Sequence, residues 1–240
     1  VGSEMCIRDR LYPHKEQEFW LWVSSWALFL NSPADLGFDS TGYDLPQMDI
    51  RYHKLTSEIR YQTDRRNGQV EIELDAAQGL TQAAREKQDS LEVRIACMKE
   101  IVDSAPNDHF ILWHDLESER KAIKKALPEA VEVYGSQDLD IREKNTIDFS
   151  EGKIRLLATK KIISGSGCNF QKHCHRAIFV GIDYKFNDFI QAIHRIYRFL
   201  QTEKVIIDII YTANEQNILD ELLAKWEEQG YTFHSLAELS

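Results

Sequence analysis

The sequence has few cysteines and no apolar run of membrane-spanning length. Four cysteines occur in 240 residues, without the spacing of a disulfide framework. We therefore expect a reduced, cytoplasmic location. The longest apolar stretch, FWLWVSSWALFL, is interrupted by two serines and is too short for a transmembrane helix. We expect a soluble chain with no membrane partner.

Basic residues are also fewer than acidic residues. The chain has 29 lysines and arginines against 39 aspartates and glutamates, which gives a formal net charge of -10. A chain this acidic does not coat nucleic acid non-specifically, although a local basic track remains compatible with the composition. Four residues supply such a track: Lys160, Lys161, Lys172 and Arg176.

Both ends of the chain carry signs of truncation. The first ten residues, VGSEMCIRDR, back-translate to a transposon-end adapter used in sequencing libraries, so we expect residues 1–10 to be an adapter remnant. Cys6 belongs to that remnant, and the natural chain is then expected to extend upstream of Leu11. Residues 231–240 show no clear stop and are expected to be a truncated tail.

The pattern of elements changes near residue 105. Residues 11–104 predict a Trp-rich helix from about Glu16 to Leu30, strands at IRYHKL and QVEIEL, and a charged helix from about Thr81 to Asp103. From residue 105 to 230 apolar strands alternate with helices. Strands are expected at HFILWH, AVEVY, IRLLAT, RAIFVGI and KVIIDIIYT, with helices over 117–127, 139–149, 186–199 and 215–229. This alternation predicts an α/β fold with a mostly parallel sheet and helices on both faces.

Two arginines stand out in the helix expected over 186–199. Its stretch QAIHRIYRFLQ puts Gln191, Arg195 and Arg198 on one face, next to an apolar stripe. The rigid donor fork of arginine matches phosphate and carboxylate geometry. A solvated or salt-bridged pair is the alternative interpretation.

Four stretches, in this order, resemble the C-terminal RecA-like lobe of superfamily 2 helicases, and most resemble its Swi/Snf-like branch in phage and restriction-modification proteins. They are FILWHDLESE, YGSQDLDIREKNTIDF, LLATKKIISGSGCNF and QAIHRIYRFLQ, within residues 110–212. The last resembles Gln-Ala-x-x-Arg-x-x-Arg-x-Gly-Gln, with Leu200 in place of the glycine. The interval from Thr159 to Gly167 is two residues longer than in the main Swi/Snf pattern.

The resemblance implies that ATP binds between two lobes and that arginines of this lobe reach its γ-phosphate. Arg195 and Arg198 are then the expected catalytic fingers, a role worth roughly 10³ to 10⁵ in rate. The nucleotide is expected to contact Gln191, Gly167 and Asn169. The nucleic-acid backbone is expected to contact Thr159, Lys160, Lys161, Ser136 and His114.

The first lobe is expected to be incomplete. No stretch matches the phosphate-binding pattern G-x-x-x-x-G-K-[ST]. The resemblance therefore makes residues 11–104 the tail of a first lobe plus an interlobe segment, and residues 105–230 the helicase lobe. Mg²⁺ is expected to be held mainly by the upstream lobe, and this chain alone is expected to be inactive. Expected partners are double-stranded DNA, the upstream lobe and a fused or associated methylase or nuclease.

Three short stretches of the sequence allow an interpretation other than a motor lobe. The stretch GSGCNF followed by Asp183 imitates a dinucleotide-binding fingerprint, but the next strand follows too soon for the required helix. Adjacent His-Cys-His at 173–175 lacks the spaced pairs of a zinc site, so we expect no metal. The tryptophans of the first helix are most simply core or an interface to the absent lobe.

The favoured function is the second motor lobe of an ATP-dependent DNA helicase or translocase. The rival is a non-catalytic RecA-like module that binds nucleic acid or a partner. Retention of both arginines favours the motor, and the overall acidity favours the rival. Strand separation or translocation, DNA or RNA, and the oligomeric state stay open.

Overall fold

The computed structural model describes residues 13–26, 33–39, 41, 44–55, 90–163 and 168–228. The chain divides into two units, Val1–Asp44 and Leu45–Ser240. The first unit contains helix α1, Glu16–Ser24, and the 3-10 turns η1, Pro13–Lys15, and η2, Pro33–Leu36. The helix predicted from Glu16 is confirmed as far as Ser24, and residues 27–30 of that prediction lie outside the described residues.

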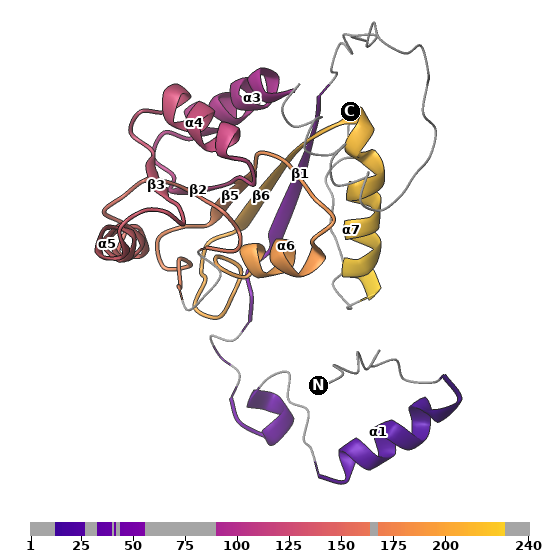
Figure 1. The fold of residues 1–240 in the computed structure, drawn as a ribbon. Coiled ribbons are helices and arrows are strands. Elements are labelled where there is room, and N and C mark those ends of the chain that lie inside the picture. Colours follow the sequence, from indigo (N-terminus) through magenta and orange to yellow (C-terminus); the bar gives the residue numbers. More distant parts are fainter. Residues whose placement is uncertain are drawn as a thin grey trace, which may run out of the picture. The chain divides into compact units, whose positions relative to one another are not determined.

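Six parallel strands form the sheet of the second unit (Figure 1). They lie in the order β1-β6-β5-β2-β4-β3, and β2, β4 and β5 are buried along their whole length. Strands covered on both faces need such apolar runs, so the predicted parallel α/β fold is confirmed. The strands are β1 Met48–Leu55, β2 Phe110–Trp113, β3 Val131–Val133, β4 Leu156–Thr159, β5 Arg176–Phe179 and β6 Val205–Thr212.

Helices cover both faces of this sheet. Helices α3, Leu91–Asp103, and α4, Glu117–Ala126, pack on one face, where Met98 and Ile123 join the strand residue Leu112 in one core. The other face carries α5, Leu139–Ser150, α6, Phe186–Ile193, and α7, Gln216–Glu228. The 3-10 turn η3, Ala213–Glu215, leads into α7. Among the described residues, no helix has the length and apolar character that a bilayer span requires.

The edge strand β1 belongs to this sheet although it precedes residue 105. It pairs in parallel with β6, from Met48 opposite Val205 to Leu55 opposite Thr212. The unit that contains the sheet begins at Leu45, so the change in pattern near residue 105 is not its boundary. The predicted strand QVEIEL and the start of the predicted helix before α3 lie outside the described residues.

A buried arginine connects α3 to two strands. The Arg94 guanidinium donates to the carbonyls of Val180 (3.1 Å) and Ile210 (3.2 Å) and to the Glu215 carboxylate (2.5 Å), while its Nε donates to Ser90 Oγ (2.6 Å). Arg94 and Glu215 are both fully buried. A buried charge is tolerated only when it is paired and hydrogen-bonded, so each member of this pair depends on the other.

Removing one member of that pair should therefore be costly. We expect Arg94→Met to lower the free energy of unfolding by about 3 to 5 kcal/mol, measured by urea denaturation, because Glu215 would keep an uncompensated buried charge. The control is Lys99→Met on the same helix, where the ion pair with Asp103 is solvent-exposed and should be worth less than about 1 kcal/mol. Equal losses in the two variants would contradict this account.

Candidate functional site

The segment that carries the two arginines lies beyond the end of α6. The sequence predicts one helix over 186–199, but α6 ends at Ile193 and residues 194–200 form turns. The carbonyl of Arg195 accepts the backbone N–H of Phe170 at 3.1 Å. Because this carbonyl binds a neighbouring segment in place of the N–H four residues later, the helix does not continue. The prediction of a shared helical face is wrong.

Both arginines nevertheless meet at one short segment. Arg195 Nη1 donates to the carbonyl of Cys168 (3.4 Å), and Arg198 Nη1 donates to Oδ1 of Asn169. Burial lowers the pKa of Arg195, and the nearby charge of Arg198 lowers it further. Two guanidinium groups held this close, one of them partly desolvated, form a site that favours an anion.

A buried glutamine holds this arrangement in place. Nε2 of Gln201 donates to the carbonyls of Cys174 and Ile196, both at 3.1 Å. Cys174 lies just before β5, and Gln201 lies just before β6. The arginine-bearing turns are thus attached to the connections that enter the amino ends of these two strands.

The other two residues expected at the nucleotide are less well defined. Gln191 lies exposed in the last turn of α6. Gly167 lies outside the described residues. The structure therefore brings Arg195, Arg198 and Asn169 together and leaves the roles of these residues as predictions.

The residues expected at nucleic acid lie at the carboxyl ends of three neighbouring strands. His114 follows β2, Thr159 ends β4, and Ser136 follows β3. The strand order places β2, β4 and β3 side by side, and the backbone N–H of His114 donates to the carbonyl of Thr159 at 3.2 Å. Ser136 is exposed, Lys160 is half-buried, and the Thr159 side chain is buried. Their roles also stay predictions.

Lys161 has a different environment from the one expected. Its ammonium is only 4% exposed and pairs with Asp115 Oδ1 (3.1 Å) and Asp183 Oδ1 (3.2 Å). Burial by itself lowers the pKa of Lys161, but the two carboxylates outweigh burial and raise it. This side chain joins the loops that follow β2, β4 and β5, so it is not exposed to a phosphate backbone.

His114 is a buried neutral base at the same edge. Its side chain is 1% exposed, and neither ring nitrogen makes a hydrogen bond of standard geometry within the described residues. Burial and, to a smaller extent, the charge of Lys160 together lower its pKa to about 4, against an opposing effect of Asp115. At neutral pH the ring therefore adds no positive charge to this edge.

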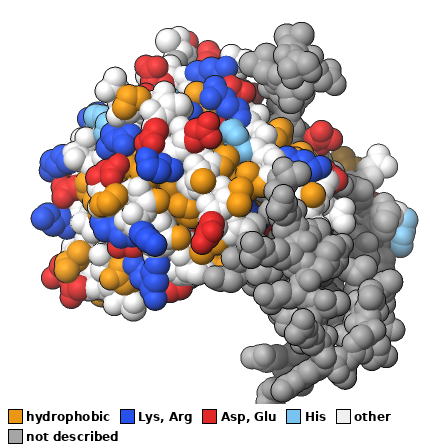
Figure 2. Space-filling model, turned by 90° about the horizontal axis from the view of Figure 1, so that it is seen from above, with side chains coloured by type: hydrophobic (Ala, Val, Ile, Leu, Met, Phe, Trp, Pro, Cys, Tyr) orange, Lys and Arg blue, Asp and Glu red, His pale blue; other side chains and the backbone are white. Residues whose placement is uncertain are grey.

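Charge is mixed on the face that Figure 2 shows. On the described part of this face, lysine and arginine side chains alternate with acidic ones. The chain as a whole has more acidic than basic residues. A contact with nucleic acid at this face would therefore come from a few placed residues and not from a broad basic field.

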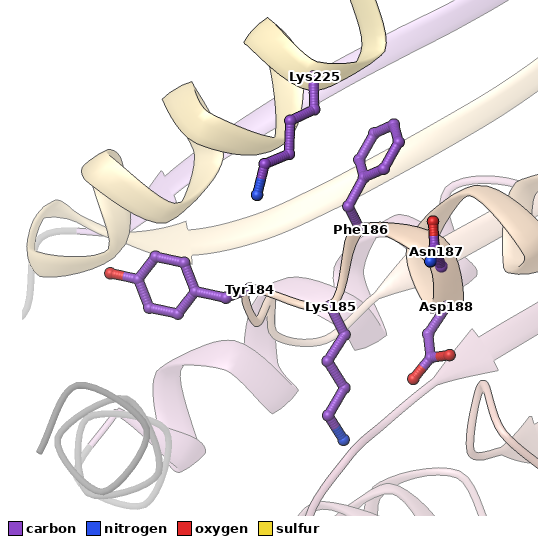
Figure 3. Close-up of a pocket in the computed structure, with 6 residues that line it drawn as sticks. All are labelled: Tyr184, Lys185, Phe186, Asn187, Asp188 and Lys225. Atoms are coloured by element: carbon purple, nitrogen blue, oxygen red, sulfur yellow. The ribbon is translucent and has the colours of Figure 1, made fainter. Parts of the chain in front are cut away.

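A cavity that the sequence did not indicate lies between α6 and α7 (Figure 3). Its volume is about 510 Å³, and Lys225 reaches from α7 toward the segment Tyr184–Phe186. Asn187 and Asp188, in the first turn of α6, complete the lining. The cavity is at the opposite end of α6 from Arg195 and is separate from the arginine cluster.

Solved structures with similar folds include domains of DEAD-box proteins. The C-terminal domain of the DEAD-box protein Dbp5 has a TM-score of 0.51 and 13% identity, over 78% of this chain and 87% of its own. The chain has a RecA-like α/β fold. Dbp5 of S. cerevisiae bound to Gle1 and IP6 gives the same TM-score and identity, over 76% of this chain and 40% of its own.

This chain matches less than half of the length of a third similar structure. The C-terminal part of the Fun30 ATPase domain has 19% identity and a TM-score of 0.49, and the match covers 54% of this chain and 44% of that structure. No family model and no curated protein matches the sequence.

The RecA-like lobe has an unusual backbone position directly after the second arginine. Leu200 has φ +70° and is 61% exposed. This is the position where the resembled pattern has glycine, which adopts positive φ without the steric cost that a side chain brings. Leu200 therefore adopts a backbone conformation that is strained for a residue with a side chain.

Substitution at this position should follow backbone geometry. We expect Leu200→Gly to be neutral or to stabilise the fold by up to about 1 kcal/mol, and Leu200→Ile to destabilise it by about 1 kcal/mol or more, because β-branched residues tolerate positive φ least. Thermal melting of the three proteins measures this. A Leu200→Ile protein as stable as the parent would contradict the assigned turn.

Proposed function

We propose that this chain is the second motor lobe of an ATP-dependent DNA helicase or translocase. The observation that carries the proposal is the convergence of Arg195 and Arg198 on Cys168–Asn169 in a lobe with this fold. The same fold occurs in proteins with many different functions. The proposal of phosphoryl transfer therefore rests on the arginine cluster and not on the sheet.

The proposed chemistry of the cluster is charge stabilisation. In phosphoryl transfer, negative charge spreads over the equatorial oxygens of the γ-phosphoryl group, and arginine donors stabilise it there. Arg195 and Arg198 would act as the fingers, with Asn169 positioning Arg198 through its hydrogen bond and Gln191, exposed on α6, as a further nucleotide contact. ATP and its Mg²⁺ would be held mainly by an upstream first lobe.

The proposed nucleic-acid contact is the carboxyl edge of β3 and β4. Of the five residues expected at nucleic acid, Lys160 and Ser136 are the two whose side chains solvent reaches. Ammonium and hydroxyl groups contact phosphate without reading sequence. The buried side chains of Thr159 and His114 would pack beneath the surface at this edge and support its exposed residues. Lys161 would support it by holding the loops together through Asp115 and Asp183.

The finger assignment is tested in a longer chain that carries its first lobe. We expect Arg195→Ala or Arg198→Ala to reduce DNA-stimulated ATP hydrolysis by about two orders of magnitude or more, with ATP affinity nearly unchanged, because a finger acts mainly in the transition state. Lysine at either position should restore little of the ATP hydrolysis, since lysine lacks the planar donor fork of arginine.

The control for this experiment is Arg155→Ala. Arg155 is a partly exposed arginine whose ion-pair partner is Glu129 and not a residue of the cluster, and its loss should leave turnover unchanged. Variants at 195 or 198 that melt earlier but keep full turnover would overturn the finger assignment. A longer chain that binds DNA and does not hydrolyse ATP would favour the non-catalytic module.

The two neighbouring lysines should respond differently. Lys160→Ala should reduce the slope of log affinity against log salt by about one, similarly across DNA sequences, as expected for one lost phosphate contact. Lys125→Ala, on an exposed lysine in the last turn of α4, is the matched control and should not change that slope.

Lys161→Met should act on stability and not on the salt slope. We expect it to lower the free energy of unfolding by about 3 kcal/mol, because two carboxylates would lose their shared cation. A Lys161→Met protein with unchanged stability and a reduced salt slope would reverse the roles given to the two lysines.

A further inference from the structure

The arginine-bearing segment lies outside a helix, so its backbone carbonyls need donors from elsewhere. A carbonyl that loses water and stays unpaired costs free energy. Five consecutive carbonyls of this segment each accept a hydrogen bond, and side chains supply three of the donors. The contacts are Phe170 N–H to the carbonyl of Arg195 (3.1 Å), Gln201 Nε2 to Ile196 (3.1 Å), His194 Nδ1 to Tyr197 (3.0 Å), Gln201 N–H to Arg198 (3.0 Å) and Gln171 Nε2 to Phe199 (3.2 Å).

Gln171 completes a row of contacts between two segments. Each of the four residues 168–171 makes one contact with the arginine-bearing turns. In chain order these are Cys168 O with the side chain of Arg195, Asn169 Oδ1 with the side chain of Arg198, Phe170 N–H with the carbonyl of Arg195, and Gln171 Nε2 with the carbonyl of Phe199. Because Phe199 directly follows Arg198, the amide of Gln171 holds the backbone from which that guanidinium extends.

His194 closes the turn between the two arginines. It directly precedes Arg195, and the carbonyl that its Nδ1 contacts belongs to Tyr197, which directly precedes Arg198. A carbonyl only accepts, so Nδ1 carries the proton in this contact. The hydrogen bond thus joins the residue before one arginine to the residue before the other, and it fixes their relative position.

We propose that Gln171 and His194 are positioning residues for the arginine fingers. The proposal rests on the proposed function, in which Arg195 and Arg198 stabilise charge in the transition state. Such groups must be held in place before the reaction, because a displacement of about 1 Å can cost about 10²-fold in rate. Each positioning residue acts through the carbonyl that it binds and not through contact with the nucleotide.

The first test is amide hydrogen exchange in the whole chain. It follows the backbone N–H groups of Phe170 and Gln201, which donate to the carbonyls of the two arginines. Gln171→Met removes the donor and keeps a long side chain, and we expect both amides to exchange about three- to tenfold faster, as the loss of one hydrogen bond allows. The N–H of Val180, which donates to the carbonyl of Trp113, is the reference and should not change.

A pair of variants at 194 isolates the donor. His194→Phe keeps a ring near that of Tyr197, 6.4 Å away between centroids, and loses the hydrogen bond. It should accelerate the same two amides by about three- to tenfold. His194→Asn keeps a donor at the δ position and should restore the parent rates. Unchanged exchange in both Gln171→Met and His194→Phe would overturn the proposal, as would equal acceleration by phenylalanine and asparagine at 194.

The second test measures DNA-stimulated ATP hydrolysis in the longer chain that carries its first lobe. Gln171→Met and His194→Phe should each lower kcat by about three- to tenfold, with KM for ATP and the melting temperature nearly unchanged, because the arginines act in the transition state. Gln216→Met is the matched control. Nε2 of Gln216 donates to Asp220 Oδ1 at 3.0 Å on α7, and its loss should leave kcat unchanged.

The outcomes distinguish this proposal from the finger assignment. A large loss of turnover in Arg195→Ala, beside full turnover in Gln171→Met and His194→Phe, would refute the positioning role and leave the fingers in place. Full turnover in Arg195→Ala would instead refute the fingers, and the catalytic role of both positioning residues with them.

Discussion

All six strands run in one direction, and the position of each candidate group follows from that constraint. Parallel strands bring their carboxyl ends to one edge of the sheet, where the side chains after β2, β3 and β4 gather. The connections that return to the amino ends of β5 and β6 meet at the other edge. There the backbone of Phe170 and the side chain of Gln201 attach the arginine-bearing turns to the segment before β5.

The same constraint explains where charge is buried. A parallel sheet is covered on both faces, so charged side chains near its ends lose water unless they are paired. Arg94, Lys161 and Asp208 each meet this requirement with partners from separate elements. Arg94 and Lys161 join segments that the strands alone do not connect, whereas Asp208 on β6 pairs with residues of the neighbouring strands β1 and β5. Loss of Arg94 or Lys161 should therefore affect the fold before it affects any chemistry.

The sequence predicts the sheet well and the site only in part. Apolar runs such as FILW and LLAT are unambiguous, because each is buried on both faces. The end of α6 was not predictable from periodicity, since it depends on the tertiary hydrogen bond between Phe170 and Arg195. The burial of Lys161 depends on Asp115 and Asp183, which are distant in sequence. The local sequence around Lys161 therefore gives no sign of its burial.

Under the proposed function, one connection joins both halves of the site. The chain from β4 to β5 begins with Thr159 and Lys160 at the carboxyl edge and reaches Cys168 and Asn169 at the arginines. It is attached at both ends, by the ion pairs of Lys161 and by the Phe170–Arg195 hydrogen bond. Under that proposal, Lys160 at the nucleic-acid edge and Asn169 at the arginines belong to one connection between β4 and β5. The contacts with nucleotide and with nucleic acid would then be made by the same stretch of chain, because parallel strands require a connection that returns from one edge of the sheet to the other.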